Sequence, residues 1–240
     1  IYPIKNVVVV EIMGRNSGWL TLAAGLEHFM GGVYPQIVAI PEIPFDEFGF
    51  LNQVKELLKT EHTVICAVSE GIRNHNGDYV GMETKSGAVD TFGHTYLSGV
   101  GKYLELQIAE KIGCKVRSIE LNVMQRCSAH LASKTDLDEA VQIGEAAVSA
   151  AEAGATGIMM VFERTSNHPY AVRIAQTDVS NVANLAKDVP ECWHDLSDQS
   201  VRDEIKQYLL PLMQGELEPI RDKTGLPVFL DIRGIHSTRE

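Results

Sequence analysis

The chain has 240 residues, 45% of them hydrophobic, and a formal net charge of −11 at pH 7. This apolar content is enough for one large core or two modest ones without disulfide bonds. The acidic balance excludes a general nucleic-acid binder, because phosphate backbones favour a basic face. The longest apolar runs have the length of strands, so we expect neither a membrane span nor a signal peptide.

The four cysteines are scattered and form no Cys-x-x-Cys pair; they are Cys66, Cys114, Cys127 and Cys192. We expect reduced thiols in or near the core of a cytoplasmic protein, with a metal site as the alternative. The chain opens without Met, a few residues before a strand-like run. We therefore expect a fragment of a longer protein.

The first half of the chain alternates between strand and helix patterns. Strand-like runs lie at Asn6–Ile12, Ile37–Ile40, Thr63–Val68 and Cys114–Leu121, and helical patterns cover Trp19–His28, Phe50–Lys59 and Tyr96–Ile112. Apolar, β-branched strands alternating with helices predict βαβ units. The expected fold class is α/β, with a doubly wound, mainly parallel sheet of Rossmann-like units and a helical C-terminal extension.

The second half begins with a predicted helix over Leu137–Ala153, which Thr135 caps and Gly154 ends. A fifth buried strand is expected at Thr156–Phe162. After an irregular polar stretch, a last helix is predicted from Val201 to Met213. The Met and aromatic positions expected in the core are Met159, Met160, Phe162 and Trp19.

Polar residues follow the predicted strands, and ligands of open α/β sheets bind outside the carboxyl ends of the strands. Gly14 and Gly18 flank Arg15 at a helix start, where unpaired N–H groups, the helix dipole and a guanidinium favour a phosphate. The alternative is that Arg15 pairs with a carboxylate and the glycines only permit a tight turn. Local pattern alone does not separate these interpretations.

Three further side chains near strand ends are candidates for ligand contact. The Glu70 carboxylate can accept hydrogen bonds from sugar hydroxyls, or it is simply a capping or solvated acid. Arg117 and Arg126 can bind an anion, or each forms a surface ion pair. His94 and His130 are interpreted as caps or packing contacts rather than catalytic groups.

Several separated segments resemble the phosphofructokinase family, in the family's order and spacing. They are Val9–Trp19 with its Met-Gly-Arg motif, Ile40–Glu42, Val68–Gly71, Asp90–His94, Arg117–Arg126, Ser133–Asp136 and Gly154–Arg164. The resemblance covers Lys5 to Arg164 closely and the tail loosely. So many ordered motifs are not expected by chance.

The resemblance implies a site for fructose 6-phosphate. Its contacts from one subunit would be Met13, Gly14, Glu70 and Arg126. Arg117 would reach the 6-phosphate of sugar bound mainly by a neighbouring subunit, which implies a homo-oligomer, either a dimer or a tetramer. Arg15 would be the catalytic cation beside the transferring phosphoryl group, whose spread charge it would stabilise.

Three positions depart from the family pattern. Val123 stands where many members have a histidine, and Asn6, with Lys5 beside it, replaces a phosphate-binding arginine. The stretch Lys59–His62 is too acidic for the allosteric nucleotide site of many bacterial ATP enzymes. Because that basic patch is lacking and the Met-Gly-Arg and Gln-Arg segments look most like pyrophosphate enzymes, we favour pyrophosphate as phosphoryl donor; ATP is the alternative.

The family's donor loop, metal ligands and catalytic aspartate would precede residue 1. The parent enzyme would convert fructose 6-phosphate to fructose 1,6-bisphosphate in glycolysis with Mg²⁺, whereas this chain alone is expected to be inactive. Residues 1–125 are expected to form the sugar-phosphate domain, 126–164 to pack on the missing donor half, and 165–240 to form a C-terminal extension.

Two functions from other classes remain as alternatives. A non-catalytic sugar-phosphate-binding or oligomerisation module would lack the donor half naturally, and the reading frame upstream of Ile1 would distinguish it. A dinucleotide-binding protein is less favoured, because no Gly-x-Gly-x-x-Gly follows the first strand.

Overall fold

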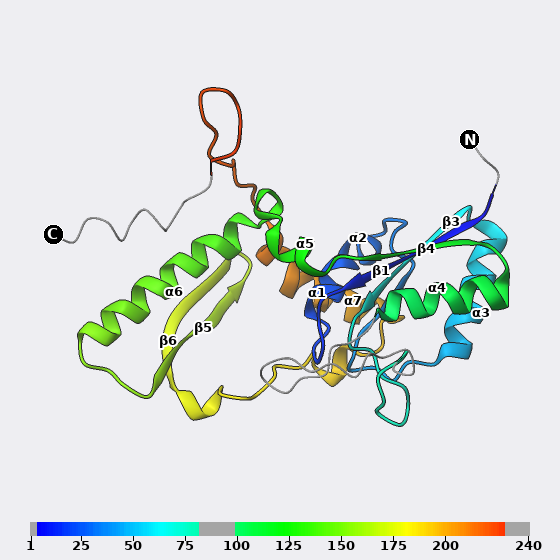
Figure 1. Ribbon diagram of the computed structural model, residues 1–240. Coiled ribbons are helices and arrows are strands. Elements are labelled where there is room, and N and C mark those ends of the chain that lie inside the picture. Colours follow the sequence, from blue (N-terminus) through cyan, green and yellow to red (C-terminus); the bar gives the residue numbers. More distant parts are fainter. Residues whose placement is uncertain (1–3, 82–98, 229–240) are drawn as a thin grey trace.

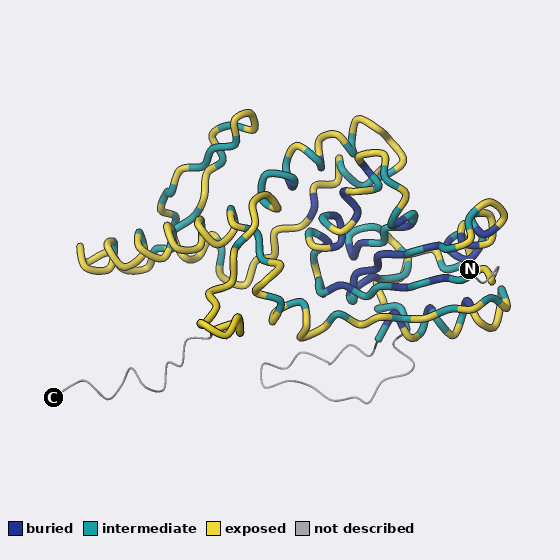
Figure 2. The backbone as a smooth tube through the Cα atoms, turned by 90° about the horizontal axis from the view of Figure 1, so that it is seen from above, coloured by how far each residue is buried: buried dark blue, intermediate teal, exposed yellow. Residues whose placement is uncertain are grey.

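The computed structural model describes residues 4–81 and 99–228 (Figure 1). Figure 1 shows an α/β body and, beside it, an arm in which one long helix lies along a two-stranded hairpin. Figure 2 shows that the buried residues concentrate in the body, while the arm is largely exposed. His94 and the start of the helix predicted at Tyr96 lie outside the described residues.

The body contains a four-stranded parallel sheet with the strand order β2-β3-β1-β4. The strands are β1 (Asn6–Ile12), β2 (Ile37–Ala39), β3 (Thr63–Ser69) and β4 (Lys115–Glu120). Each of these four predicted strands is confirmed to within two residues at either end. The α/β class with a parallel sheet is likewise confirmed, because crossover helices join the parallel strands.

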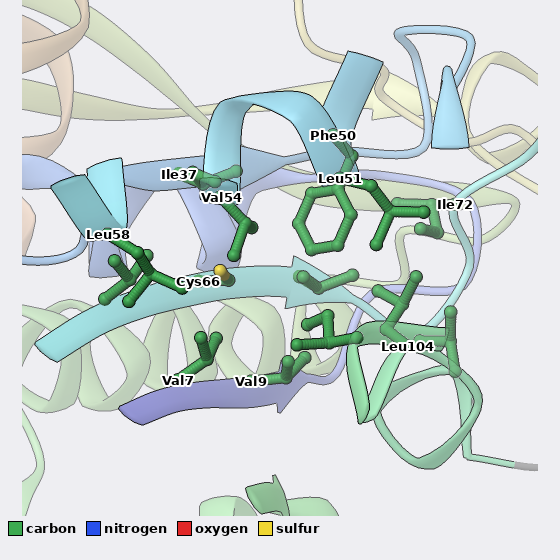
Figure 3. Packing of buried hydrophobic residues seen from close by; sticks show 14 residues of the cluster. Val7, Val9, Ile37, Phe50, Leu51, Val54, Leu58, Cys66, Ile72 and Leu104 are labelled. Atoms are coloured by element: carbon green, nitrogen blue, oxygen red, sulfur yellow. The ribbon is translucent and has the colours of Figure 1, made fainter. Parts of the chain in front are cut away.

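The helices α3 (Glu47–Thr60) and α4 (Val100–Ile112) cover one face of this sheet. Asp46 caps α3 by accepting the N–H of Phe48, so the helix begins earlier than the apolar periodicity at Phe50 suggested. Figure 3 shows the resulting core, in which Val54, Cys66 and Leu104 are each fully buried between helices and strands.

The opposite face carries a second core built by α1 (Trp19–Ala24), α2 (Leu26–Phe29) and α7 (Gln199–Leu209). The helical pattern predicted over Trp19–His28 is confirmed, but it is divided at Gly25 into α1 and α2. The first helix closes at Gly25, whose Cα lies so near Val38 that a Cβ would come within 2.9 Å of that side chain. Buried Leu22 and Ile205 show that α7 belongs to this core.

The arm consists of α6 (Lys134–Glu152), β5 (Ile158–Asn167) and β6 (Tyr170–Asp178). The fifth strand predicted at Thr156–Phe162 is confirmed as part of β5, but its expected burial is wrong: β5 pairs antiparallel with β6, apart from the parallel sheet. The hairpin has no second layer among the described residues beyond α6, so Met159 is 49% and Phe162 37% exposed, not core. Ser133, rather than Thr135, caps α6.

Short helices join these parts: α5 (Asn122–Cys127) and the 3₁₀ turns η2 (Ala129–Leu131), η3 (Val179–Asn181), η4 (Glu191–Trp193) and η5 (Leu210–Met213).

All four cysteines are free. Cys66 is buried and Cys114 partly buried, but Cys127 and Cys192 are exposed, so the expected near-core position is wrong for the last two. None of the helices in the described ranges is long and apolar enough to cross a membrane.

Helix α4 offers a test of the first core, because Leu104 is fully buried and Leu106 is 51% exposed on the same helix. We expect Leu104→Ala to lower the free energy of unfolding by about 2–5 kcal/mol, through lost burial and a residual cavity. Leu106→Ala should change it by less than about 0.5 kcal/mol. Urea unfolding of both variants measures the difference, and equal losses would contradict the assignment of the core.

Candidate functional site

The site lies where the carboxyl ends of β1, β3 and β4 meet. The strands pair in register, so Ile12 lies opposite Ser69 and Glu11 opposite Glu120. The helix after β1 packs on one face of the sheet, and the next helix described after β3 packs on the other. Such a divergence opens a crevice between neighbouring strand ends, which is the usual ligand position in open α/β sheets.

The turn after β1 is held against the exit of β3 by hydrogen bonds. The N–H of Gly14 donates to Glu70 Oε1 at 3.2 Å, and Ser69 Oγ donates to the carbonyl of Gly14 at 2.5 Å. The N–H of Glu70 donates to the carbonyl of Ile12 at 2.9 Å. Glu70 Oε2 has no hydrogen-bond partner among the described residues and can accept one from a ligand.

The same turn is pressed against Gly71, which is buried. A Cβ at position 71 would lie 1.8 Å from the carbonyl oxygen of Arg15. Because this neighbour is backbone, it cannot swing aside as a flexible side chain can. Only glycine therefore allows the Arg15 backbone to lie on the β3 exit.

Helix α5 completes the site from the β4 side. Gln125 Oε1 accepts the N–H of Met13 at 3.1 Å, which joins α5 to the turn after β1. Arg126 follows Gln125 in the same helix. The structure thus brings together Met13, Gly14, Glu70 and the backbone of Arg126. The sequence points to Gln125 only as part of the Gln-Arg motif and does not predict its hydrogen bond with Met13.

The guanidinium groups of Arg15, Arg117 and Arg126 have no hydrogen bond or ion pair with any described residue. All other arginines within 4–81 and 99–228 donate to a carbonyl, a tyrosine hydroxyl or a carboxylate. The alternative in which each of the three forms an ion pair is therefore not what the structure shows. Unpaired guanidiniums in a chain with excess negative charge are available to bind an anion.

Arg117 is separate from the strand-end cluster. It lies opposite Val8, four residues before the end of β1, or about 13 Å along the strand at the usual rise per residue. Its neighbour Ser118 faces α4, where Oγ donates to Glu105 at 2.5 Å. Because successive side chains alternate, Arg117 faces away from α4 and is exposed on the edge strand.

Lys5 lies away from the strand-end site. The ammonium of Lys5 donates to the carbonyl of Leu58, at the end of β1 opposite the site. The Lys5 ammonium therefore already has a hydrogen-bond partner there, away from the strand-end site.

In the described part of the chain, no three His, Cys, Asp or Glu side chains are grouped so that they could hold a metal ion. These residues alone do not fit a magnesium site.

Glu11 lies within β1, just before the site. Burial raises the pKa of its carboxyl, and the negative charges of Glu120 and Glu70 add to the rise, while the N–H of Gly101, which donates to Oε2 at 2.7 Å, opposes it. Carboxylates on neighbouring strand ends thus crowd one another.

The close approach at Gly71 can be tested by adding one methyl group. We expect Gly71→Ala to lower the free energy of unfolding by about 1–3 kcal/mol, because the Arg15 backbone must shift. The matched control is Gly144→Ala in α6, where nothing lies within 4 Å of the added Cβ. The control should stabilise the chain by up to about 1 kcal/mol. Chemical denaturation measures both, and a neutral Gly71→Ala would contradict the contact.

The raised pKa of Glu11 makes stability depend on pH. Since its folded pKa lies above the ordinary value of 4.5, its contribution is fully present below pH 4.5 and is lost as pH rises through the folded pKa. Glu11→Gln keeps an acceptor for Gly101 and removes this titration. Between pH 4.5 and pH 7 the variant should therefore gain stability relative to the original chain in urea unfolding. If the difference in the free energy of unfolding between the variant and the original chain were the same at pH 4.5 and pH 7, the pKa of Glu11 would not be raised in the folded chain.

Comparison with known proteins agrees with the geometry. The family model "Phosphofructokinase" matches residues 3–151. Pyrophosphate–fructose 6-phosphate 1-phosphotransferases of Xanthomonas campestris pv. campestris and Halomonas elongata are 34% and 36% identical over 96% and 92% of this chain. The pyrophosphate-dependent phosphofructokinase structure from Nitrosospira multiformis matches 95% of the chain with a TM-score of 0.78 at 32% identity. This chain covers 54%, 52% and 52% of those three proteins, about half of each. It belongs to the phosphofructokinase family.

Proposed function

We propose that this chain is the fructose 6-phosphate-binding part of a pyrophosphate-dependent phosphofructokinase. The observation that supports the proposal is the cluster at the strand ends, where Gly14 donates to Glu70 and Gln125, which precedes Arg126, accepts the N–H of Met13. The guanidinium groups of Arg15 and Arg126 have no partner among the described residues. Its residues offer cations for a phosphate and a carboxylate oxygen for sugar hydroxyls. The printed names of the relatives supply the same substrate and donor.

Each residue has a distinct role in this proposal. Arg126 binds the sugar phosphate, Glu70 Oε2 accepts from sugar hydroxyls, and the backbone at Met13 and Gly14 lines the crevice. Arg15 lies beside the transferring phosphoryl group, where a fixed cation stabilises the charge that spreads over its oxygens. These roles use hydrogen-bonding capacity that the chain itself leaves unsatisfied.

Arg117 fits a role in a site that two subunits share, rather than in the strand-end site of its own chain. It is exposed, unpaired and set back along the edge strand β4. We assign it to the 6-phosphate of sugar bound by a second copy of the chain, which requires a homo-oligomer. The exposed position on an edge strand supports this assignment, because a neighbouring subunit can approach there.

The phosphoryl donor and the catalytic aspartate belong, in this proposal, to the other half of the parent enzyme. Pyrophosphate is favoured over ATP, and Mg²⁺ would neutralise phosphate charge through ligands outside the described residues. In the expected three-part division, residues 126–164, which include α6 and the first part of β5, would pack against that half, and residues 165–240 would form the C-terminal extension. The cytoplasm, with its reduced thiols, suits the free cysteines. The chain alone should give no turnover with fructose 6-phosphate and either donor.

Binding of fructose 6-phosphate, measured by calorimetry, tests the site directly. We expect Arg126→Ala to weaken binding by about 1.5–3 kcal/mol, or roughly 10- to 150-fold in Kd, through the loss of a charge-assisted contact. The control is Arg221→Ala, which removes an arginine that already donates to the carbonyl of Gly225. Its affinity should be unchanged. If the unaltered chain fails to bind, or if both variants bind alike, the proposed function is wrong.

A further inference from the structure

The turn that carries Arg15 is held from behind by a segment far away in the sequence. This clamp segment, Lys187–Val189, precedes α7 by about ten residues of irregular chain. The carbonyl of Lys187 accepts Ser17 Oγ at 3.1 Å and Trp19 Nε1 at 2.7 Å. Two hydrogen bonds to one carbonyl thus attach the clamp segment to the residues directly after the Arg15 turn.

Glu42, which follows β2, joins the same two segments. Its Oε1 accepts the N–H of Gly18 at 3.0 Å and the N–H of Val189 at 2.9 Å. Gly18 is the first residue before α1, and its backbone lies so close that a Cβ would be 2.9 Å from Glu42 Oε2. One carboxylate oxygen therefore satisfies backbone donors from two segments that are 171 residues apart, Gly18 and Val189.

The Glu42 carboxylate is stabilised only while the turn and the clamp segment keep this arrangement. Its second oxygen, Oε2, is buried and has no hydrogen-bond partner among residues 4–81 and 99–228. Burying a carboxylate oxygen in this state is unfavourable. The charge-assisted bonds at Oε1 offset that cost only while the turn and the clamp segment keep their places.

An aromatic cluster supports the clamp segment. The Trp19 ring packs on Tyr208 at 5.4 Å and on Trp193 at 5.9 Å between ring centroids. The Lys187 ammonium donates to the Tyr208 hydroxyl at 3.0 Å and lies over the Trp19 ring. The two rings that face Trp19 come from the region between the clamp segment and the end of α7.

We propose that Glu42 and Trp19 are positioning residues, through which the clamp segment fixes the Arg15 turn for binding of the sugar phosphate. The inference rests on the proposed function for its ligand. It assigns a role in the site to residues 187–209, which are bonded to the residues after the Arg15 turn. A turn released from the clamp would still fold against Gly71, but with a wider range of Arg15 positions.

The two tryptophans of the chain provide a matched pair of variants. Trp19→Phe removes the bond to the Lys187 carbonyl, whereas Trp193→Phe removes the bond from Nε1 to Glu204 Oε2 at 2.8 Å. Both keep a ring in the same cluster and lose one indole hydrogen bond. Only the first loses a bond between the clamp segment and the turn. Glu42→Gln is the third variant, because a neutral amide oxygen is a weaker acceptor for Gly18 and Val189.

Hydrogen exchange of the whole chain is the first measurement. Trp19→Phe and Glu42→Gln should speed exchange in peptides that cover residues 14–19 and 187–190, with β3 unchanged. Trp193→Phe should leave residues 14–19 protected. Unchanged exchange in the turn with both Trp19→Phe and Glu42→Gln would overturn the inference, whether or not any sugar phosphate binds.

Affinity for fructose 6-phosphate is the second measurement. We expect Trp19→Phe and Glu42→Gln each to raise Kd about two- to tenfold, the range for one ordinary hydrogen bond, while Trp193→Phe binds like the original chain. Equal effects of the two tryptophan variants would reduce Trp19 to a packing residue and overturn its positioning role. If the original chain binds no fructose 6-phosphate, the proposed function fails, and the exchange result alone decides whether the clamp holds the turn.

Discussion

The close approach of two backbone segments, the turn after β1 and the exit of β3, is the constraint on which the site depends. The Arg15 carbonyl lies where any side chain at Gly71 would clash, and Gly14 donates to Glu70 across the same contact. The backbone of Arg15 and the carboxylate of Glu70 are thereby brought to the same strand ends, and no ion pair joins the two residues. Both keep the hydrogen-bonding capacity that a phosphorylated sugar would use.

The electrostatics of the chain fit a local anion site in an acidic protein. The formal charge of −11 would repel an extended polyanion, whereas a small anion would meet only the charges around its own site. There burial raises the pKa of the Glu11 carboxyl, and the negative charges of Glu120 and Glu70 add to the rise. A bound anion would provide a partner for arginines that have none among the described residues.

The C-terminal part of the chain is integrated with the body rather than appended to it. Val189, Ile205 and Leu209 lie in the second core with the helices that follow β1. The end of α7 also accepts both Nη groups of Arg164 through the carbonyls of Tyr208 and Gln207, which ties the hairpin to the same region. Helices α1 and α2 near the start of the chain and α7 near its end therefore pack together in the second core.

The amino-acid sequence by itself determined the parallel strands, the helices between them and the family, because apolar periodicity and glycine-marked turns are local signals. It also pointed to Arg15, Glu70 and Arg126 through positions after strands. Their proximity, the contact of Gln125 with Met13 and the bonds of Glu42 were decided only by the tertiary structure, since they join residues far apart in the chain. The same reason explains the error at β5. An apolar run of strand length does not show which strand will pair with it, and here antiparallel β6 left one face uncovered.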